Sequence, residues 1–369
     1  MAKLSYEQLK AVITQYVVRN SLCSDNLDIT RNNIVGLADK IGKITSLDTE
    51  YIDKLQYMDS DVLQFGKTVE EWSIDLSLAQ DYDPSGANTL APNYATFRPA
   101  QYSKELGRKF VKTTIPYGNI ERGVNNEGEL IAITALIMKR LEDSHAAYKY
   151  AVKREMVGAL CEMCDNAMNA STVFTATQTY AVNTYLKESS TSDVRGVVVK
   201  PYKNSASNWA EAVSNGFIIV LDLITKIAKP TDTATGEAFI KAIKNDVETA
   251  SDLSEGHSLN GNSLGATSGL KLLLTQKIKS VMEVDVQAGA FQADKVAVPA
   301  EEITIKDFGS ADSSFFAVLL DSRAIRLYNA YNAVREQSNG EGDFINYIRH
   351  FDYTGQISKN AFVRIYKAE

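Results

Sequence analysis

The chain has 369 residues, a mass of 40.6 kDa, 44% hydrophobic residues and a formal net charge of -7. This size and composition fit a globular protein with one large core or two ordinary ones, and they exclude a disordered chain. The negative charge argues against tight, non-specific binding to nucleic acid, although a protein that only encloses DNA is compatible with it.

The N-terminal segment shows no signal for secretion or for membrane insertion. Apolar residues at 9–17 alternate with charged ones in an amphipathic pattern. The strongest apolar run, 217–223, is interrupted by Asp222 and is far shorter than the roughly 18 residues that cross a bilayer. We therefore expect an intracellular protein at synthesis, which fits three cysteines without a disulfide pattern.

Two segments of opposite charge flank the turn-forming sequence Asp83-Pro84-Ser85-Gly86. Residues 59–83 hold seven acidic side chains and one lysine, whereas residues 98–122 hold six basic side chains and two glutamates. Apolar residues alternate at 69–78 and 106–115, which is typical of strands. The pattern predicts an extended hairpin of these two segments. Because an isolated two-stranded ribbon is only marginally stable in water, the hairpin needs a partner surface.

The opposite charges of the hairpin have two interpretations. They can pair across the strands, which contributes on the order of a few tenths of a kcal/mol per exposed pair. They can also dock the hairpin onto neighbouring copies of the chain. The candidates for such inter-subunit contacts are Glu70, Glu71, Asp75, Lys104, Arg108, Lys109 and Lys112.

The longest periodic pattern covers residues 128–168, which contain no proline. Its steps of three and four predict one helix about 60 Å long with a single buried face. Asn126 and Glu129 form a capping-box sequence at its start. Gly158 costs up to about 1 kcal/mol relative to alanine and permits a bend. The buried stripe is expected at Leu130, Thr134, Ile137, Leu141, His145, Tyr148, Val152, Met156, Ala159, Met163 and Ala167.

The rest of the chain alternates between strand and helix patterns, which predicts a compact α/β domain followed by closing strands. The predicted strands are 171–185, 197–199, 270–274, 303–305, 315–321, 325–331, 344–353 and 362–366. The predicted helices are 208–229, stopped by Pro230, then 237–250 and a helical pair in 276–291, with a flexible stretch at 251–269.

One sequence motif matches the nucleophile elbow of α/β hydrolases. Gly261-Asn262-Ser263-Leu264-Gly265 has the G-x-S-x-G spacing, and Asp321 and His350 follow in the hydrolase order. An elbow requires an apolar strand leading into the serine, whereas residues 251–260 are polar. We interpret the motif as a surface loop.

Metal and phosphate sites are also not expected. Cys161 and Cys164 form one C-x-x-C pair inside the predicted helix, without a second pair, and the histidines are scattered, so buried thiols are favoured over zinc. The glycine-rich residues 256–269 lack the Gly-Lys-Ser/Thr sequence of a phosphate-binding loop. The sequence therefore predicts no catalysis, no cofactor and no metal.

The order of elements resembles the major capsid protein of tailed bacteriophages, which has the Hong Kong 97 type shell fold, and most nearly that of small short-tailed phages. Order and spacing, rather than any single motif, carry the resemblance. Its residues are Phe65-Gly66-Lys67-Thr68-Val69-Glu70-Glu71, then 102–117, 270–274, 284–286, 290–291, 317–331 and 360–364.

The resemblance implies an α+β fold with four parts. These are an N-terminal arm (1–58), an extended hairpin loop (59–122), a peripheral domain (123–196 and 315–369) with the spine helix 128–168, and an axial domain (197–314). It implies pentamers and hexamers that close into an icosahedral shell. The shell would enclose double-stranded DNA without sequence-specific binding, would assemble in the host cytoplasm without a membrane, and would have scaffolding and portal proteins as partners.

Three alternatives stay open at this point. An encapsulin-like compartment would share the fold and hold an enzyme in place of DNA. An α/β hydrolase would use Ser263. A surface-layer or filament protein would share the assembly logic and would need a secretion signal, which the sequence does not show.

Overall fold

The computed structural model describes residues 51–63, 68–74, 84, 86, 97–102, 104–116, 127–172, 194–199, 218–262, 269–276, 278–283, 298–342 and 344–369. The chain divides into two compact units, Met1–Ile52 and Asp53–Glu369. All the described helices and strands lie in the second unit. The amphipathic pattern at 9–17 lies outside the described residues.

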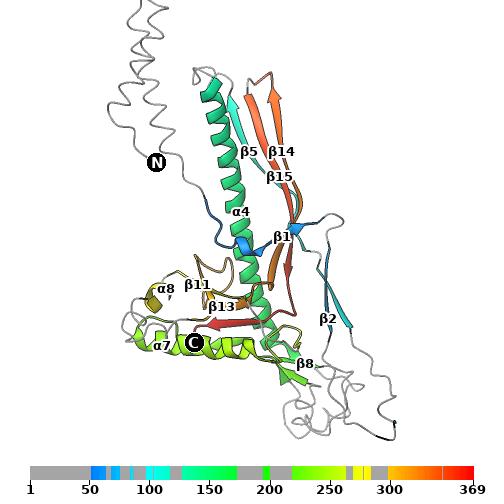
Figure 1. The fold of residues 1–369 in the computed structure, drawn as a ribbon, viewed down its shortest axis with the longest axis vertical. Coiled ribbons are helices and arrows are strands. Elements are labelled where there is room, and N and C mark those ends of the chain that lie inside the picture. Colours follow the sequence, from blue (N-terminus) through cyan, green and yellow to red (C-terminus); the bar gives the residue numbers. More distant parts are fainter. Residues whose placement is uncertain are drawn as a thin grey trace, which may run out of the picture. The chain divides into compact units, whose positions relative to one another are not determined.

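The predicted long helix is confirmed as α4 (Glu127–Asn169), which is continuous over 43 residues (Figure 1). Its buried face differs in part from the prediction. Leu141, His145 and Met156 are buried as expected, whereas Ala159 is exposed. Residues on a second side of the helix are also buried, because α4 is covered on more than one side near its C-terminal end. These residues are Lys153, Val157, Gly158, Leu160, Cys161 and Cys164.

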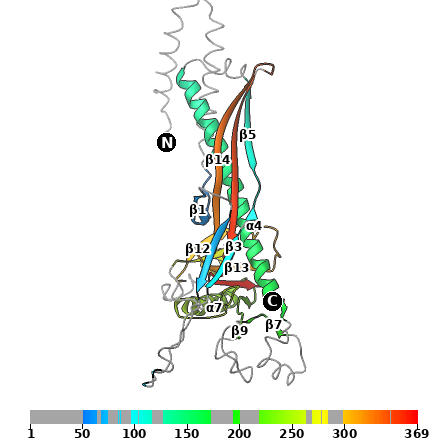
Figure 2. The ribbon, with the colours of Figure 1, turned by 90° about the vertical axis from the view of Figure 1, so that its right-hand side faces the viewer.

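A long sheet runs beside α4 (Figures 1 and 2). Its centre is the antiparallel hairpin of β14 (Ile325–Asn339) and β15 (Phe344–Ile357). β1 (Asp59–Val62) follows the short 3₁₀ helix η1 (Gln56–Met58) and joins β14 in parallel. On the other side, β4 (Lys104–Glu105) and β5 (Lys109–Pro116) pair antiparallel to β15. The ring of Phe351 packs against His145 and Tyr148 of α4, so this sheet and helix share one core.

A second five-stranded sheet has the order β10-β16-β13-β11-β12. Its strands are β10 (Ile224–Lys226), β16 (Val363–Lys367), β13 (Phe315–Asp321), β11 (Leu270–Thr275) and β12 (Glu301–Ile305). Every residue of β13 is buried, as its continuous apolar sequence requires. The domain boundary expected at 314/315 therefore cuts through one hydrogen-bonded sheet, because β13 and β16 pair with strands from the expected axial segment.

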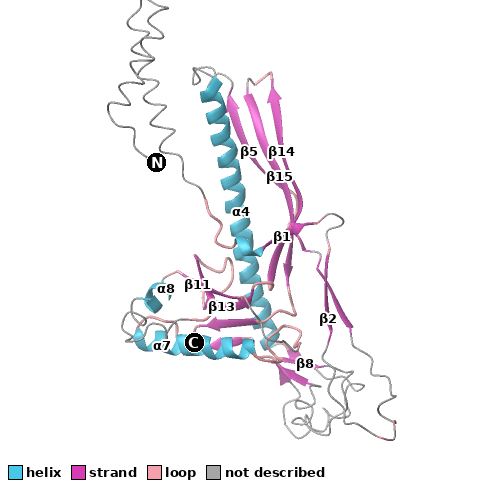
Figure 3. Ribbon diagram, viewed as in Figure 1, coloured by secondary structure: helices cyan, strands magenta, loops and turns pink. Residues whose placement is uncertain are grey.

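Helix α7 (Thr233–Ser251) packs on this second sheet and confirms the predicted helix 237–250. Asp232 caps it by accepting a hydrogen bond from the backbone N–H of Thr235. The ring of Phe239 lies 5.3 Å from that of Phe316 and 5.1 Å from that of Tyr366. The second core thus forms between α7 and the sheet, and α8 (Ile278–Ser280) also contributes to it (Figure 3).

The prediction of a helix at 208–229 is wrong for its described part. Residues from 218 onward form β9 (Ile218–Val220) and β10, and β9 pairs with β8 (Val197–Val199). The apolar spacing fitted both a helix and short strands, and the β-branched sequence Ile-Ile-Val favours the strand. The predicted strand 171–185 is seen as β6 (Ser171–Thr172), which pairs with β7 (Val194–Arg195), and the rest lies outside the described residues.

The predicted hairpin is confirmed in part, and the pairing expected for its residues 106–115 is wrong. β2 (Val69–Ile74) pairs with β3 (Phe97–Tyr102), from Val69 opposite Tyr102 to Ile74 opposite Phe97. The basic residues 104–116 pair with β15 instead. A segment with alternating apolar residues can pair with many other strands. The partner of β5, strand β15, lies more than 200 residues later in the sequence, so no local pattern indicates the pairing.

Candidate assembly surfaces

The ribbon of β2 and β3 forms a two-stranded sheet that presents apolar side chains to solvent. Burial alternates along β2, as the pleat of a strand requires. Trp72 is 60% exposed and Ile74 is 58% exposed, and Glu70 lies on the same exposed face. Adjacent exposed large apolar side chains on a narrow ribbon mark a contact surface.

The other face of the ribbon is fixed at its root by Glu71. One carboxylate oxygen accepts a hydrogen bond from the Ser358 hydroxyl at 2.6 Å, and the other accepts one from the Tyr102 hydroxyl at 2.8 Å. The Tyr102 oxygen accepts in turn from the backbone N–H of Lys359 at 3.1 Å. Burial and the nearby Glu71 raise the pKa of Tyr102 to about 12. Both carboxylate oxygens of Glu71 are thus used within the chain, so the structure assigns it to the root of the ribbon.

The four basic candidates are separated by the pleat of the long sheet. Lys109 lies opposite Phe351, on the side of the sheet that contacts α4. Lys112 lies on the opposite side by strand alternation, and Arg108, which precedes β5, lies there with its guanidinium over the ring of Tyr331. Lys104, in β4, lies opposite Gly355 of β15. Asp75 lies outside the described residues.

An apolar groove of about 710 Å³ lies between α4 and the root of the ribbon. Side chains of the predicted helical stripe that are only half-buried, including Tyr148, Val152 and Met163, form its floor. Lys109 and Lys359 also line it. The half-buried part of the stripe is therefore a concave, largely apolar surface whose charged lining residues are Lys109, Lys359 and Glu155.

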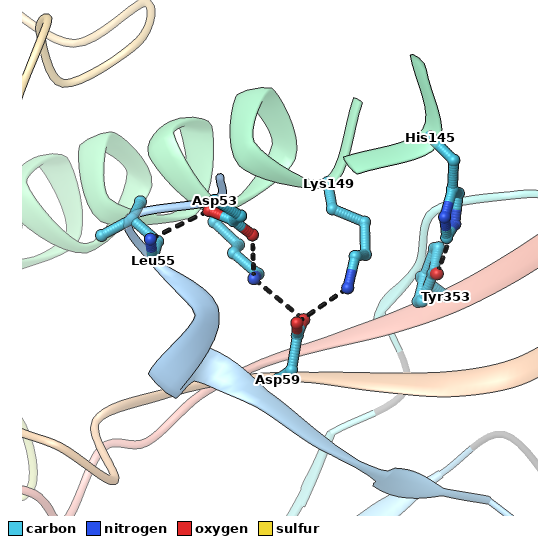
Figure 4. Close-up of polar contacts among 7 residues, drawn as sticks. Asp53, Leu55, Asp59, His145, Lys149 and Tyr353 are labelled. Atoms are coloured by element: carbon cyan, nitrogen blue, oxygen red, sulfur yellow. Dashed lines mark hydrogen bonds and ion pairs between the residues drawn. The ribbon is translucent and has the colours of Figure 1, made fainter. Parts of the chain in front are cut away.

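A buried ion network holds the chain segment before β1 against α4 (Figure 4). The ammonium group of Lys153 lies 2.6 Å from the carboxylate of Asp53 and 2.9 Å from that of Asp59. Asp59 also pairs with Lys149 at 2.7 Å. The Lys153 side chain is 0% exposed, so these two carboxylates compensate the positive charge that water cannot reach. The sequence analysis did not predict this network. The signal available was the pair Lys149 and Lys153, four residues apart on one side of the helix, and two aspartates, Asp53 and Asp59, before and at the start of β1.

One helical turn from this network, His145 pairs with Tyr353 across the interface of helix and sheet (Figure 4). The His145 Nε2 and the Tyr353 hydroxyl lie 2.6 Å apart. Burial, together with the charges of Arg349 and Lys149, lowers the pKa of His145 to about 4. The histidine is therefore neutral at pH 7 and serves as a packed hydrogen-bonding group.

The hydrolase residues do not form a triad in the described structure. The Asp321 carboxylate pairs with the guanidinium of Arg323 at 2.9 Å. His350 lies in the long sheet opposite Phe110, whereas Asp321 lies at the end of β13 in the second sheet. Ser263 lies outside the described residues.

The two cysteines of α4 are confirmed as buried free thiols. Burial raises the pKa of Cys164 to about 12 and also that of Cys161, which keeps both thiols protonated. Among the described residues, the acidic, histidine and cysteine side chains form no group that could hold a metal. In the same part of the chain, no helix has the length and hydropathy to span a membrane.

The fold is that of tailed-phage capsid proteins, as three solved structures show. A chain from the capsid of Staphylococcus phage Andhra has a TM-score of 0.57 at 11% identity, covering 87% of this chain and 86% of that one. A chain from the structure of head fiber and inner core protein gp22 of native bacteriophage P68 has a TM-score of 0.53 at 12% identity, covering 87% and 86%. A chain from the capsid of cyanophage P-SCSP1u has a TM-score of 0.50 at 7% identity, covering 87% and 89%.

The family follows from the sequence profile of the Phi29-like phage major capsid proteins, which matches residues 2–365. The chain belongs to this family. It is a shell-forming structural protein of the virion capsid and has no enzymatic role. No curated protein sequence matches it. The resemblance to tailed-phage capsid proteins is thus confirmed, and the hydrolase alternative is not supported.

Proposed function

We propose that the chain assembles into pentamers and hexamers that close into an icosahedral shell around double-stranded DNA, with scaffolding and portal proteins as partners. In this proposal the ribbon of β2 and β3 is the extended loop. Helix α4 and the long sheet form the peripheral domain, and α7 with the second sheet forms the axial domain. The exposed apolar face of the ribbon is the observation that carries the proposal, because no surface within the described residues covers Trp72 and Ile74.

The apolar groove on a second copy fits this face of the ribbon in chemistry. Trp72 and Ile74 offer apolar side chains to a largely apolar groove, and Glu70 on the same face can approach its lysines. Contacts of this kind run head to tail and close into a ring. The charged pairs set orientation more than affinity. We propose Glu70 and Lys109 for this contact, because Glu70 lies on the exposed face of the ribbon and Lys109 lines the groove. Asp75 and Lys104, from the same two charged segments, also stay in the proposed contact.

The test is assembly of a double variant of the ribbon. Trp72→Ser with Ile74→Ser should give a folded subunit that forms no closed shells, seen by sedimentation and negative-stain electron microscopy. Leu253→Ser is the control, because Leu253 is an equally exposed apolar side chain (61%) that follows α7 and is not part of the ribbon. Normal shells from the double variant, or equal damage from the control, would show that the ribbon face is not the contact.

The family assignment favours a phage shell over an encapsulin-like compartment, which would form a closed shell from the same kind of subunit. The cargo separates the two. Shells produced with the neighbouring phage genes should contain nuclease-protected DNA, whereas a compartment should contain a co-purifying enzyme.

A further inference from the structure

The long sheet has a second surface that the subunit contact above leaves unused. Phe351 packs on α4, so its strand neighbours His350 and Asp352 face the other way. The register then aligns the residues of β5, β15 and β14 in rows across this outer side. In Figure 2 the sheet lies in front of α4, and no described element covers its upper part. This surface, called the basic face below, consists of Phe110, Lys112, Tyr331, Arg335 and His350, together with Arg108, whose guanidinium lies over the Tyr331 ring.

The exposed charges of the basic face are all positive. Arg108, Lys112 and Arg335 are exposed. In the described rows from 108 to 112, Asp352 is the one carboxylate on this side, and it is buried. Glu105, opposite Thr354, is an exposed carboxylate on the same side, in the next row beyond Asp352. A cluster of three exposed cations stands out on a chain whose net charge is -7.

Two of the guanidinium groups are held in place by one tyrosine. The guanidinium carbon of Arg108 lies 4.4 Å from the centre of the Tyr331 ring. Arg335 also lies close to Tyr331, and its guanidinium lowers the pKa of this tyrosine. Guanidinium groups fixed in this way lose less conformational freedom when they bind phosphate oxygens. Phe110 lies between these cations, is 61% exposed and packs against His350 at 6.0 Å.

We infer that the basic face binds the phosphate backbone of nucleic acid and therefore lines the inside of the shell. Cations that follow a sheet surface, with an exposed aromatic ring among them, are the features with which proteins bind nucleic acid without sequence preference. The inference rests on the proposed enclosure of DNA and names the residues that meet the enclosed molecule. It also takes Arg108 and Lys112 out of the set of inter-subunit contacts, because they lie on the side away from the groove.

The salt dependence of binding gives the expected size of the effect. Each phosphate contact contributes about 0.9 to the slope of log affinity against log salt for duplex DNA. Removing three cations should therefore lower this slope by about 2.7. The ratio of wild-type to variant affinity should change about 40-fold between 200 and 50 mM salt.

The experiment measures binding of a fluorescent 20-base-pair duplex and of a 20-nucleotide single strand by anisotropy across this salt range. It compares the full-length wild type with the triple variant Arg108→Gln, Lys112→Gln, Arg335→Gln, matched for oligomeric state by sedimentation. The control triple removes the same charge from exposed lysines outside the long sheet, at Lys226 in β10, Lys229 after it and Lys241 in α7. Phe110→Ala separates the two ligands, since loss of binding to the single strand alone indicates stacking of an unpaired base on the ring.

The inference requires a reduced slope for the basic-face triple and an unchanged slope for the control triple. Equal slopes for both triples would overturn it. So would failure of the basic-face triple to form shells in a DNA-free assembly reaction, because the surface would then be a contact between subunits. Failure of the wild type to form shells would instead count against the proposed function, and the two failures are therefore distinguishable.

Discussion

Lys153 lies in the middle of α4 with a fully buried side chain, 2.6 Å from the carboxylate of Asp53 near the start of the second unit. Asp53 also accepts a hydrogen bond from the backbone N–H of Leu55 at 2.9 Å. Leu55 and Met58, which follow it, are fully buried in the core shared by helix and sheet. Charge pairing and apolar burial therefore hold the same short segment against α4.

Lys153→Met should destabilise the subunit by about 3–5 kcal/mol, because it leaves the buried carboxylate of Asp53 without a cation. Urea unfolding followed by circular dichroism measures this loss. The double variant Lys153→Met with Asp53→Asn should recover part of it, since no buried charge then remains unpaired at that site. A single variant within about 1 kcal/mol of the wild type would show that the ion pair has little net effect.

Glu70 and Glu71 are sequence neighbours with opposite expected roles. Glu71→Ala should destabilise the root of the ribbon by about 1–3 kcal/mol, because it removes the acceptor for the hydroxyls of Ser358 and Tyr102. Hydrogen exchange of β2 and β3 should rise, and shells should become uneven in size as the ribbon loses its fixed direction. Glu70→Ala should leave hydrogen exchange unchanged and weaken assembly only. The same effect from both variants would contradict this division.

His145 makes the stability of the subunit depend on pH. Its pKa is lowered in the folded chain to about 4, from an ordinary value of 6.5. The stabilisation that comes from the neutral ring is therefore present above pH 6.5 and is lost as the pH falls through 4, to a limit of about 3 kcal/mol. His145→Gln, which keeps a partner for Tyr353, should flatten the stability curve between pH 6.5 and 4. His350→Gln is the control on the other side of the sheet, and an equal flattening there would contradict the assignment.

Gly158 has a packing role that outweighs its low helix propensity. A Cβ atom at this position would lie 2.1 Å from the carbonyl oxygen of Phe308, closer than any real contact. Gly158→Ala should therefore destabilise the subunit, although alanine alone would favour the helix by about 1 kcal/mol. Ala159→Gly, at an exposed neighbouring position, should cost about 1 kcal/mol from propensity. Thermal unfolding measures both, and a stabilised Gly158→Ala variant would rule out the close contact.

Much of the local structure was predictable because its signal lies within a few residues. The proline-free periodic pattern gave α4 nearly to its ends, and the apolar segment 315–321 gave the central strand β13. Strands 197–199 and 270–274 were also confirmed. Where a short pattern fitted two periods, as at 218–226, the prediction was wrong.

The candidate surfaces were predictable in composition and not in arrangement. The sequence showed an acidic and a basic segment, and it favoured pairing between them. The structure pairs β5 with β15 and thereby divides the basic residues between two sides of one sheet. It also uses Glu71 within the chain, beside Glu70 on the exposed face. Neither Tyr331 nor Arg335 was a candidate, because Tyr331 meets Arg108 only across the sheet and Arg335 joins them through Tyr331.

By itself, the sequence determined the long helix, most of the strands and the resemblance to a shell protein, since periodicity, composition and element order are local or additive properties. Only the tertiary structure decided which strands pair, which side of the sheet each cation occupies and which carboxylates neutralise Lys153. These depend on contacts between residues far apart in the sequence, such as Glu71 with Ser358, 287 positions away, or Lys112 with Ile348. Strand alternation limits each residue to one of two sides, and the packing of the long sheet on α4 selects between them.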